Sequence, residues 1–111
     1  MARDTTDARP IESRDQLVDY IAAGCKPRSE WRIGTEHEKF PFYAADNSPV
    51  PYGGRRGIRA LLEGMQAMLG WEPIMDGDNI IGLVEPTGQG AISLETGGQF
   101  ELSGAPLETI H

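Results

Sequence analysis

The chain has 111 residues, which predicts one domain with a single modest hydrophobic core. Its net charge of -7 at pH 7 argues against a nucleic-acid-binding protein, because phosphates would be repelled, and is compatible with cation binding. There is no run of roughly 18 apolar residues and no apolar signal segment at the start. We therefore expect no membrane span and a cytoplasmic protein.

The chain is predicted to begin with a flexible tail over residues 1–12, followed by a domain over 13–111. Ser13 followed by Gln16 fits a capping box, and apolar residues at helical spacing come after it. This pattern predicts a short helix over about residues 14–23, which stops at Gly24.

The next stretch, EWRIGTEHEKF, alternates in polarity and predicts a strand over residues 30–40. Glu36 and Glu38 share its charged face. His37 lies on the opposite face, where a structural, hydrogen-bonded role is favoured over a metal-binding one. The prolines and turn formers of PFYAADNSPVPYGG predict a loop after this strand.

A second, longer helix is predicted for RRGIRALLEGMQAMLG, whose leucines and methionines recur at helical spacing and are expected in the core. WEPIM, NIIGLVE and AISLE then predict three short strands, with turns at DGD and PTGQG. TGGQFELS continues as a strand after a two-glycine break. This order predicts an α+β fold with two helices and a mainly antiparallel sheet.

Four glutamates on the predicted strands need an explanation: Glu36, Glu38, Glu95 and Glu101. Side chains two positions apart on a strand are roughly 7 Å apart. Two such charges repel by about 2 kcal/mol at an effective dielectric of 20, and by about 0.6 kcal/mol in water. Mg²⁺ favours one or two protein carboxylates together with substrate phosphates. The pattern alone leaves two interpretations open, which are a solvated acidic face and a site for Mg²⁺ and a nucleotide.

Arg55 and Arg56 are predicted at the start of the longer helix, where positive charge opposes the helix dipole. One interpretation is an anion site formed by guanidinium groups, glycine backbone and the helix N-terminus. The alternative is a pair of exposed arginines that form ion pairs with the protein's own glutamates.

Four segments, IGTEHEKF, YGGRRGIRALLEGM, GWEPIMDGDNIIGL and ISLETGGQFELSGAPLETIH, together resemble the glutamate–cysteine ligases of plants and many proteobacteria. The resemblance covers residues 30–111, and GGQFELSGAP is its most specific part. It implies a catalytic sheet like that of glutamine synthetase. It also implies an ATP- and Mg²⁺-dependent ligase that joins the γ-carboxylate of glutamate to the amine of cysteine through γ-glutamyl phosphate, the first step of glutathione biosynthesis.

The resemblance also implies roles for individual residues. Gln99 shares the face of the glutamates and is expected to contact substrate, and Arg55 and Arg56 are weaker candidates for contacts with substrate or ATP. Thr96 stands where the family usually has proline, and this departure is expected to loosen the turn before the last strand. The resemblance implies that Mg²⁺ is bound by four glutamates: Glu36, Glu38, Glu95 and Glu101.

Two hypotheses follow. In the first, the chain is the N-terminal segment of a ligase whose substrates are L-glutamate, L-cysteine and ATP; the remainder of the ligase chain is then expected as a partner, and the segment alone is expected to be inactive. In the second, it is a non-catalytic acidic α+β module that binds Mg-nucleotide or a partner chain.

Overall fold

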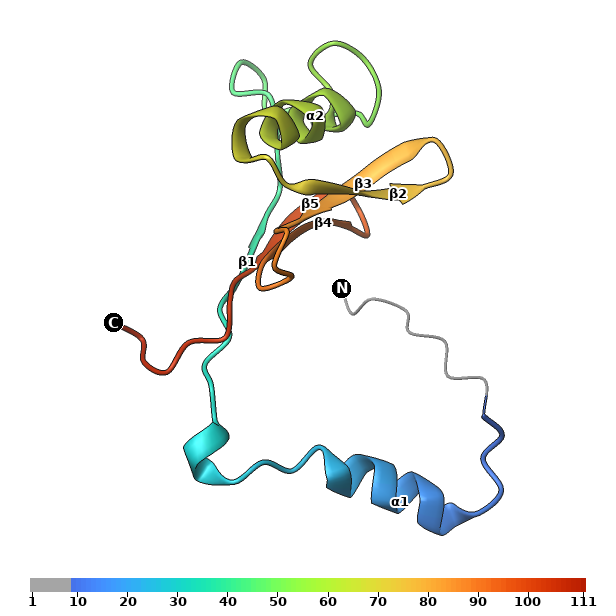
Figure 1. The fold of residues 1–111 in the computed structure, drawn as a ribbon. Helices are drawn as coiled ribbons and strands as arrows, with labels where there is room; N and C mark the ends of the chain where they lie inside the picture. The colour runs from blue at the N-terminus through green and yellow to red at the C-terminus, as the bar shows by residue number, and fades with distance from the viewer. Residues whose placement is uncertain (1–8) are drawn as a thin grey trace.

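The computed structural model describes residues 9–111, which fold around one five-stranded sheet. The elements are α1 (Arg14–Ala23), the 3-10 turn η1 (Arg28–Glu30), β1 (Glu36–Lys39), α2 (Ile58–Leu69), β2 (Glu72–Asp76), β3 (Asn79–Val84), β4 (Ala91–Glu95) and β5 (Gln99–Ser103). The strands pair antiparallel in the order β1-β5-β4-β3-β2, and α2 packs against the sheet over β3 (Figure 1). The predicted α+β class is confirmed.

Helix α1 forms where the capping box predicts it. The Ser13 hydroxyl accepts a hydrogen bond from the backbone N–H of Gln16, and the Gln16 side chain accepts one from the backbone N–H of Ser13. The helix ends at Gly24, which keeps a right-handed conformation. None of its side chains is buried, and it lies apart from the sheet (Figure 1). Of the tail predicted over residues 1–12, residues 1–8 lie outside the described part, and 9–12 form no helix or strand.

The strand predicted over residues 30–40 is shorter in the structure, which is a correction. Residues 28–30 form a 3-10 turn instead, closed by the backbone N–H of Trp31 donating to the carbonyl of Arg28. Ile33 pairs with Leu107 in an isolated bridge, and continuous pairing begins only at Glu36. The gap coincides with a shift of the pairing register by one residue, between the Ile33–Leu107 bridge and the Glu36–Ser103 pair.

The core lies between α2 and one face of the sheet. Ile58 and Leu62 of α2 pack against Ile80, Leu83 and Ile92, and all five are buried. The expectation that the whole leucine and methionine stripe of the helix lies in the core is only partly right. Met65 packs against the core, whereas Met68 is 79% exposed and Leu61 and Leu69 are 44% exposed. Among the strands, α2 contacts mainly β3, so only a narrow stripe of the helix surface is covered.

The pairing register fixes which residues share each face of the sheet. Directly paired residues point to the same side. On the side of α2 a row runs through Leu83, Ile92, Leu102 and His37, as predicted for His37. The opposite face therefore carries the other set of side chains, and it has no helix over it among the described elements. In the described part no helix is long and apolar enough to cross a membrane.

Candidate functional site: the glutamate face

The four glutamates predicted as metal ligands lie on the sheet face opposite α2, which we call the glutamate face: Glu36, Glu38, Glu95 and Glu101. Glu38 of β1 is directly opposite Glu101 of β5, and Glu101 is in turn opposite Ser93 of β4. Glu36 is paired with Ser103, and Glu95 with Gln99. The structure thus brings all four predicted metal ligands, and Gln99, onto one face across three neighbouring strands.

The close approach of β3 to this row depends on a glycine. Gly82 pairs with Ser93, and a Cβ placed on Gly82 would lie 2.5 Å from the carbonyl oxygen of Ile92. The row that begins at Glu38 therefore continues through Glu101 and Ser93 to a position without a side chain. The space over Gly82 is occupied by the Ile74 side chain, whose Cδ1 would lie 3.3 Å from that Cβ, and Ser93 is buried.

Burial differs between the four carboxylates. Glu36 and Glu38 on the edge strand β1 are exposed, Glu95 is half-buried, and Glu101 is only 8% exposed. The interpretation as a uniformly solvated acidic face does not hold for Glu101. A buried carboxylate has to be compensated by hydrogen bonds or by positive charge.

Two serine hydroxyls orient the inner carboxylates. The Ser93 hydroxyl donates to Oε1 of Glu95 at 2.8 Å, and the Ser103 hydroxyl donates to Oε1 of Glu101 at 2.9 Å. Sequence reasoning gave neither serine a role. The signal that reveals them is the spacing of two, in SLE and ELS, because residues two apart on a strand share a face.

The turn between β4 and β5 holds Glu95 and Glu101 on adjacent strands. Gly97 and Gly98 both have positive φ, 82° and 83°, and the N–H of Gly98 donates to the carbonyl of Glu95. Glycine adopts this conformation without the strain that a side chain brings. The turn closes with Thr96 in place of the proline that the resemblance implies.

The donor set of the glutamate face suits Mg²⁺ bound together with a phosphate. Within residues 9–111 no three acidic, histidine or cysteine side chains lie close enough to form a metal cage by themselves. Mg²⁺ does not need one, because it keeps several waters and uses one or two carboxylates plus substrate phosphates. Pairs such as Glu38 and Glu101 therefore fit a metal–nucleotide complex, and His37 cannot join them because it lies on the other face.

Arg55 and Arg56 lie on the side of α2, away from the glutamate face. Two N–H groups of the first turn there already have partners, since those of Ile58 and Arg59 donate to the carbonyls of Pro51 (2.9 Å) and Tyr52 (3.0 Å). The predicted anion cradle would therefore lack these two N–H donors, and the binding role of Arg55 and Arg56 stays a prediction.

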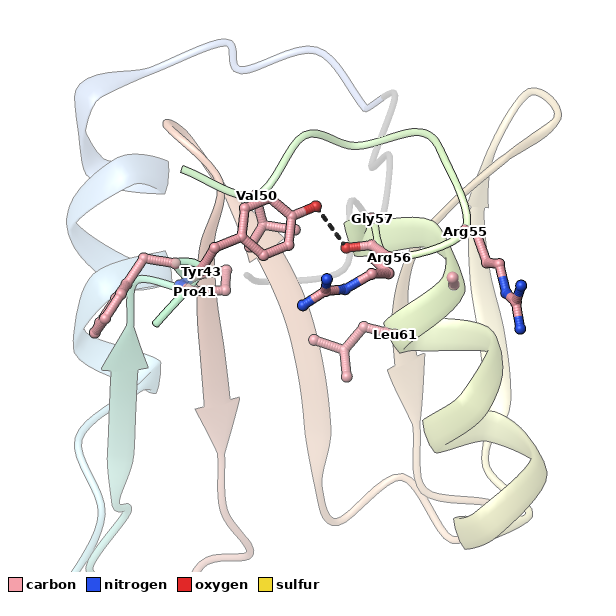
Figure 2. Close-up of a pocket in the computed structure, with 9 residues that line it drawn as sticks. Pro41, Tyr43, Val50, Arg55, Arg56, Gly57 and Leu61 are labelled. Atoms are coloured by element: carbon pink, nitrogen blue, oxygen red, sulfur yellow. Dashed lines mark hydrogen bonds between the residues drawn. The ribbon is translucent and has the colours of Figure 1, made fainter. Parts of the chain in front are cut away.

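The alternative, in which the two arginines pair with the protein's own glutamates, is not borne out among residues 9–111. In the described part of the chain the ion pairs are Arg32–Glu108 and Arg59–Glu63, and neither Arg55 nor Arg56 pairs with a carboxylate there. The two side chains point to different sides of the N-terminus of α2 (Figure 2).

Two carboxylates outside the glutamate face stabilise turns. The pKa of Glu85, between β3 and β4, lies below its usual value, because the hydroxyl and the backbone N–H of Thr87 donate to its carboxylate. The Ser48 hydroxyl and N–H lower the pKa of Asp46 in the same way. These residues are structural, so they are not part of the site.

Comparison with known proteins identifies the family to which the sequence is similar. The model of glutamate-cysteine ligase family 2 matches residues 32–111. The chain belongs to this family. It is 54% identical over 104 residues to the glutamate–cysteine ligase, chloroplastic, of Nicotiana tabacum, and the match covers 94% of this chain and 19% of the tobacco protein. The protein of the same name from Medicago truncatula is 53% identical over 102 residues, 92% of this chain and 19% of that protein.

The chain thus spans about a fifth of the length of these relatives of glutamate-cysteine ligase family 2. The Arabidopsis thaliana relative agrees, with 52% identity over 99 residues that make up 18% of its length. The expected cytoplasmic location is contradicted, because all three relatives are named chloroplastic. Composition carried no information on this point.

Proposed function

We propose that this segment supplies the metal- and nucleotide-binding face of an ATP-dependent glutamate–cysteine ligase. The whole ligase would join the γ-carboxylate of L-glutamate to the amine of L-cysteine, the first step of glutathione biosynthesis. The observation that carries the proposal is the register Glu38–Glu101–Ser93, with Glu36 and Glu95 on the same face. Membership of glutamate-cysteine ligase family 2 supports it.

The proposed role of the glutamates is to hold Mg²⁺ over the sheet. When bound, Mg²⁺ supplies charge neutralisation for the phosphates of ATP. One or two of these carboxylates would hold each Mg²⁺, together with waters and phosphates. Glu36 and Glu38 would do so from the exposed edge strand, and Glu95 and Glu101 from the two inner strands, with their carboxylates oriented by the hydroxyls of Ser93 and Ser103.

Gln99 has a different proposed role on the same face. It is paired with Glu95 at the turn end of β5 and is half-buried. Its amide can both donate and accept hydrogen bonds, whereas the carboxylates can only accept. We therefore assign Gln99 to the orientation of a substrate group and not to the metal.

The test is a chimeric ligase in which this chain replaces the matched segment of the tobacco relative. Formation of γ-glutamylcysteine and release of ADP are measured for the chimera and for Glu38→Gln and Glu101→Gln. Both substitutions keep the side-chain size and remove the charge, so we expect kcat to fall at least about 100-fold. The matched control is Glu72→Gln, because Glu72 lies on the far edge strand β2.

The outcomes separate the hypotheses. An active chimera whose Glu38→Gln and Glu101→Gln variants keep full activity would overturn the proposal. A chimera that binds Mg-ATP but forms no γ-glutamylcysteine would instead favour the non-catalytic module.

A further inference from the structure

Each inner carboxylate of the glutamate face is held by a serine two positions away on its own strand. On β4 the Ser93 hydroxyl donates to Oε1 of Glu95 at 2.8 Å, and on β5 the Ser103 hydroxyl donates to Oε1 of Glu101 at 2.9 Å. The two strands are antiparallel, and Ser93 is directly paired with Glu101. The same contact is therefore made twice, in opposite chain directions, on neighbouring strands of the proposed metal site.

These two hydrogen bonds lie in a poorly solvated part of the sheet. Ser93 is 5% exposed and Glu101 is 8% exposed, while Glu95 and Ser103 are half-buried. Water competes little for a hydrogen bond at such positions, and a bond to a carboxylate is stronger than one between neutral groups. The hydroxyl of each serine therefore restricts the rotation of the carboxylate that it binds.

A carboxylate restricted in this way differs from an unrestricted one as a metal ligand. A carboxylate can bind a cation through one oxygen or through both. Binding through both oxygens of Glu95 or Glu101 competes with the serine hydrogen bond, because Oε1 is already engaged. Binding through the other oxygen alone leaves that hydrogen bond in place. The serines therefore favour coordination of a metal through one oxygen of each glutamate.

We propose that Ser93 and Ser103 are positioning residues that make the glutamate face selective for Mg²⁺ over Ca²⁺. Mg²⁺ requires a near-octahedral set of oxygens and is held by one or two carboxylates with waters and phosphates. Ca²⁺ takes roughly 6–8 oxygens in flexible geometry and also binds carboxylates through both oxygens. Limiting each glutamate to one oxygen thus penalises Ca²⁺ more than Mg²⁺. The inference rests on the proposed function, because it concerns the same metal–nucleotide site.

The test compares the affinity of the 111-residue chain for Mg-ATP and for Ca-ATP by isothermal titration calorimetry. We expect the wild type to bind Mg-ATP more tightly than Ca-ATP. Ser93→Ala and Ser103→Ala remove a hydroxyl and keep all four carboxylates. Each should weaken Mg-ATP binding about 10-fold and Ca-ATP binding less than about 2-fold, so that the preference for Mg-ATP falls at least about 5-fold.

Two further variants separate positioning from loss of structure. Ser48→Ala removes a hydroxyl that donates to a carboxylate oxygen of Asp46 at 2.7 Å, in the loop between β1 and α2, and should leave the preference unchanged. Ser103→Thr keeps the hydroxyl and should retain the preference. A variant that is merely destabilised loses affinity for both complexes alike, and circular dichroism checks that each variant keeps the wild-type fold.

The outcomes distinguish this inference from the proposed function. If the chain binds Mg-ATP but the wild type and both alanine variants show the same preference, the role of the serines is overturned and the metal–nucleotide site stands. Equal affinity of the wild type for Mg-ATP and Ca-ATP would also overturn the inference alone. Binding of neither complex would overturn the inference and the proposed metal–nucleotide site together.

Discussion

Glu38 and Glu101 offer the most direct test of the charge repulsion on the glutamate face. They are direct cross-strand partners, so their Cβ atoms are about 4.5–5.5 Å apart. With carboxylates about 6 Å apart, the repulsion is about 0.7 kcal/mol in water and about 2.8 kcal/mol at an effective dielectric of 20. Glu38 is exposed and Glu101 is 8% exposed, so a value of about 1 kcal/mol, towards the aqueous end, is expected.

Glu38→Gln should therefore stabilise the protein when no divalent cation is present. A gain of about 1 kcal/mol raises the thermal midpoint by about 4–8 °C in a domain of this size. Saturating Mg²⁺ should raise the midpoint of the wild type, since the cation offsets the repulsion, and should raise that of Glu38→Gln less. Circular dichroism melts in EDTA and in Mg²⁺ measure both effects.

Glu72→Gln is the matched control, because Glu72 shares the glutamate face but lies four strands from Glu38, roughly 19 Å away. It removes the same charge and should leave the response to Mg²⁺ unchanged. A Glu38→Gln variant that melts below the wild type in EDTA would refute the reasoning, because Glu38 would then make a net favourable contact.

Three further predictions concern the scaffold. Leu62→Ala removes a side chain with 0% exposure from the contact between α2 and the sheet, and should lower the free energy of unfolding by about 2–5 kcal/mol in urea titrations; a change below about 1 kcal/mol would contradict the described core. Gly82→Ala places a Cβ 2.5 Å from the Ile92 carbonyl oxygen and should cost about 1–3 kcal/mol, whereas Gly64→Ala, which meets nothing within 4 Å, should not destabilise. The lowered pKa of Glu85 means that its carboxylate contributes stability above the unfolded-state value of about 4.5, and that this contribution is lost as the pH falls through the folded-state pKa. Glu85→Gln should accordingly melt below the wild type at pH 7 and at nearly the same temperature in strong acid, and a difference that persists in acid would contradict this.

Local sequence patterns predicted the glutamate face well because it depends on strand alternation. Glu36 and Glu38 had to share a face once β1 was a strand, and the same holds for Gln99 and Glu101 on β5. The register that sets Glu38 opposite Glu101 could not be predicted, because it depends on how the Gly97–Gly98 turn and the β1–β5 pairing fit together. The hydroxyl contacts of Ser93 and Ser103 follow from that face and were overlooked.

Other features depend on packing that no local pattern contains. Met68 matches the helical stripe, but it is exposed because α2 covers little more than β3. Arg55 and Arg56 are adjacent in sequence and point to different sides of the helix (Figure 2). The carbonyls that occupy the N–H groups at the start of α2 come from Pro51 and Tyr52, in a loop whose path the sequence did not predict.

The most direct test of the proposed metal–nucleotide site is the binding of Mn²⁺, a paramagnetic substitute for Mg²⁺, measured by electron paramagnetic resonance with ATP present. Wild type and Glu72→Gln should bind Mn²⁺ more tightly than ATP alone does. The double variant Glu36→Gln, Glu38→Gln should lose at least about 10-fold in affinity. Equal Mn²⁺ affinity in the wild type and the double variant would contradict the assignment of a metal to the glutamate face.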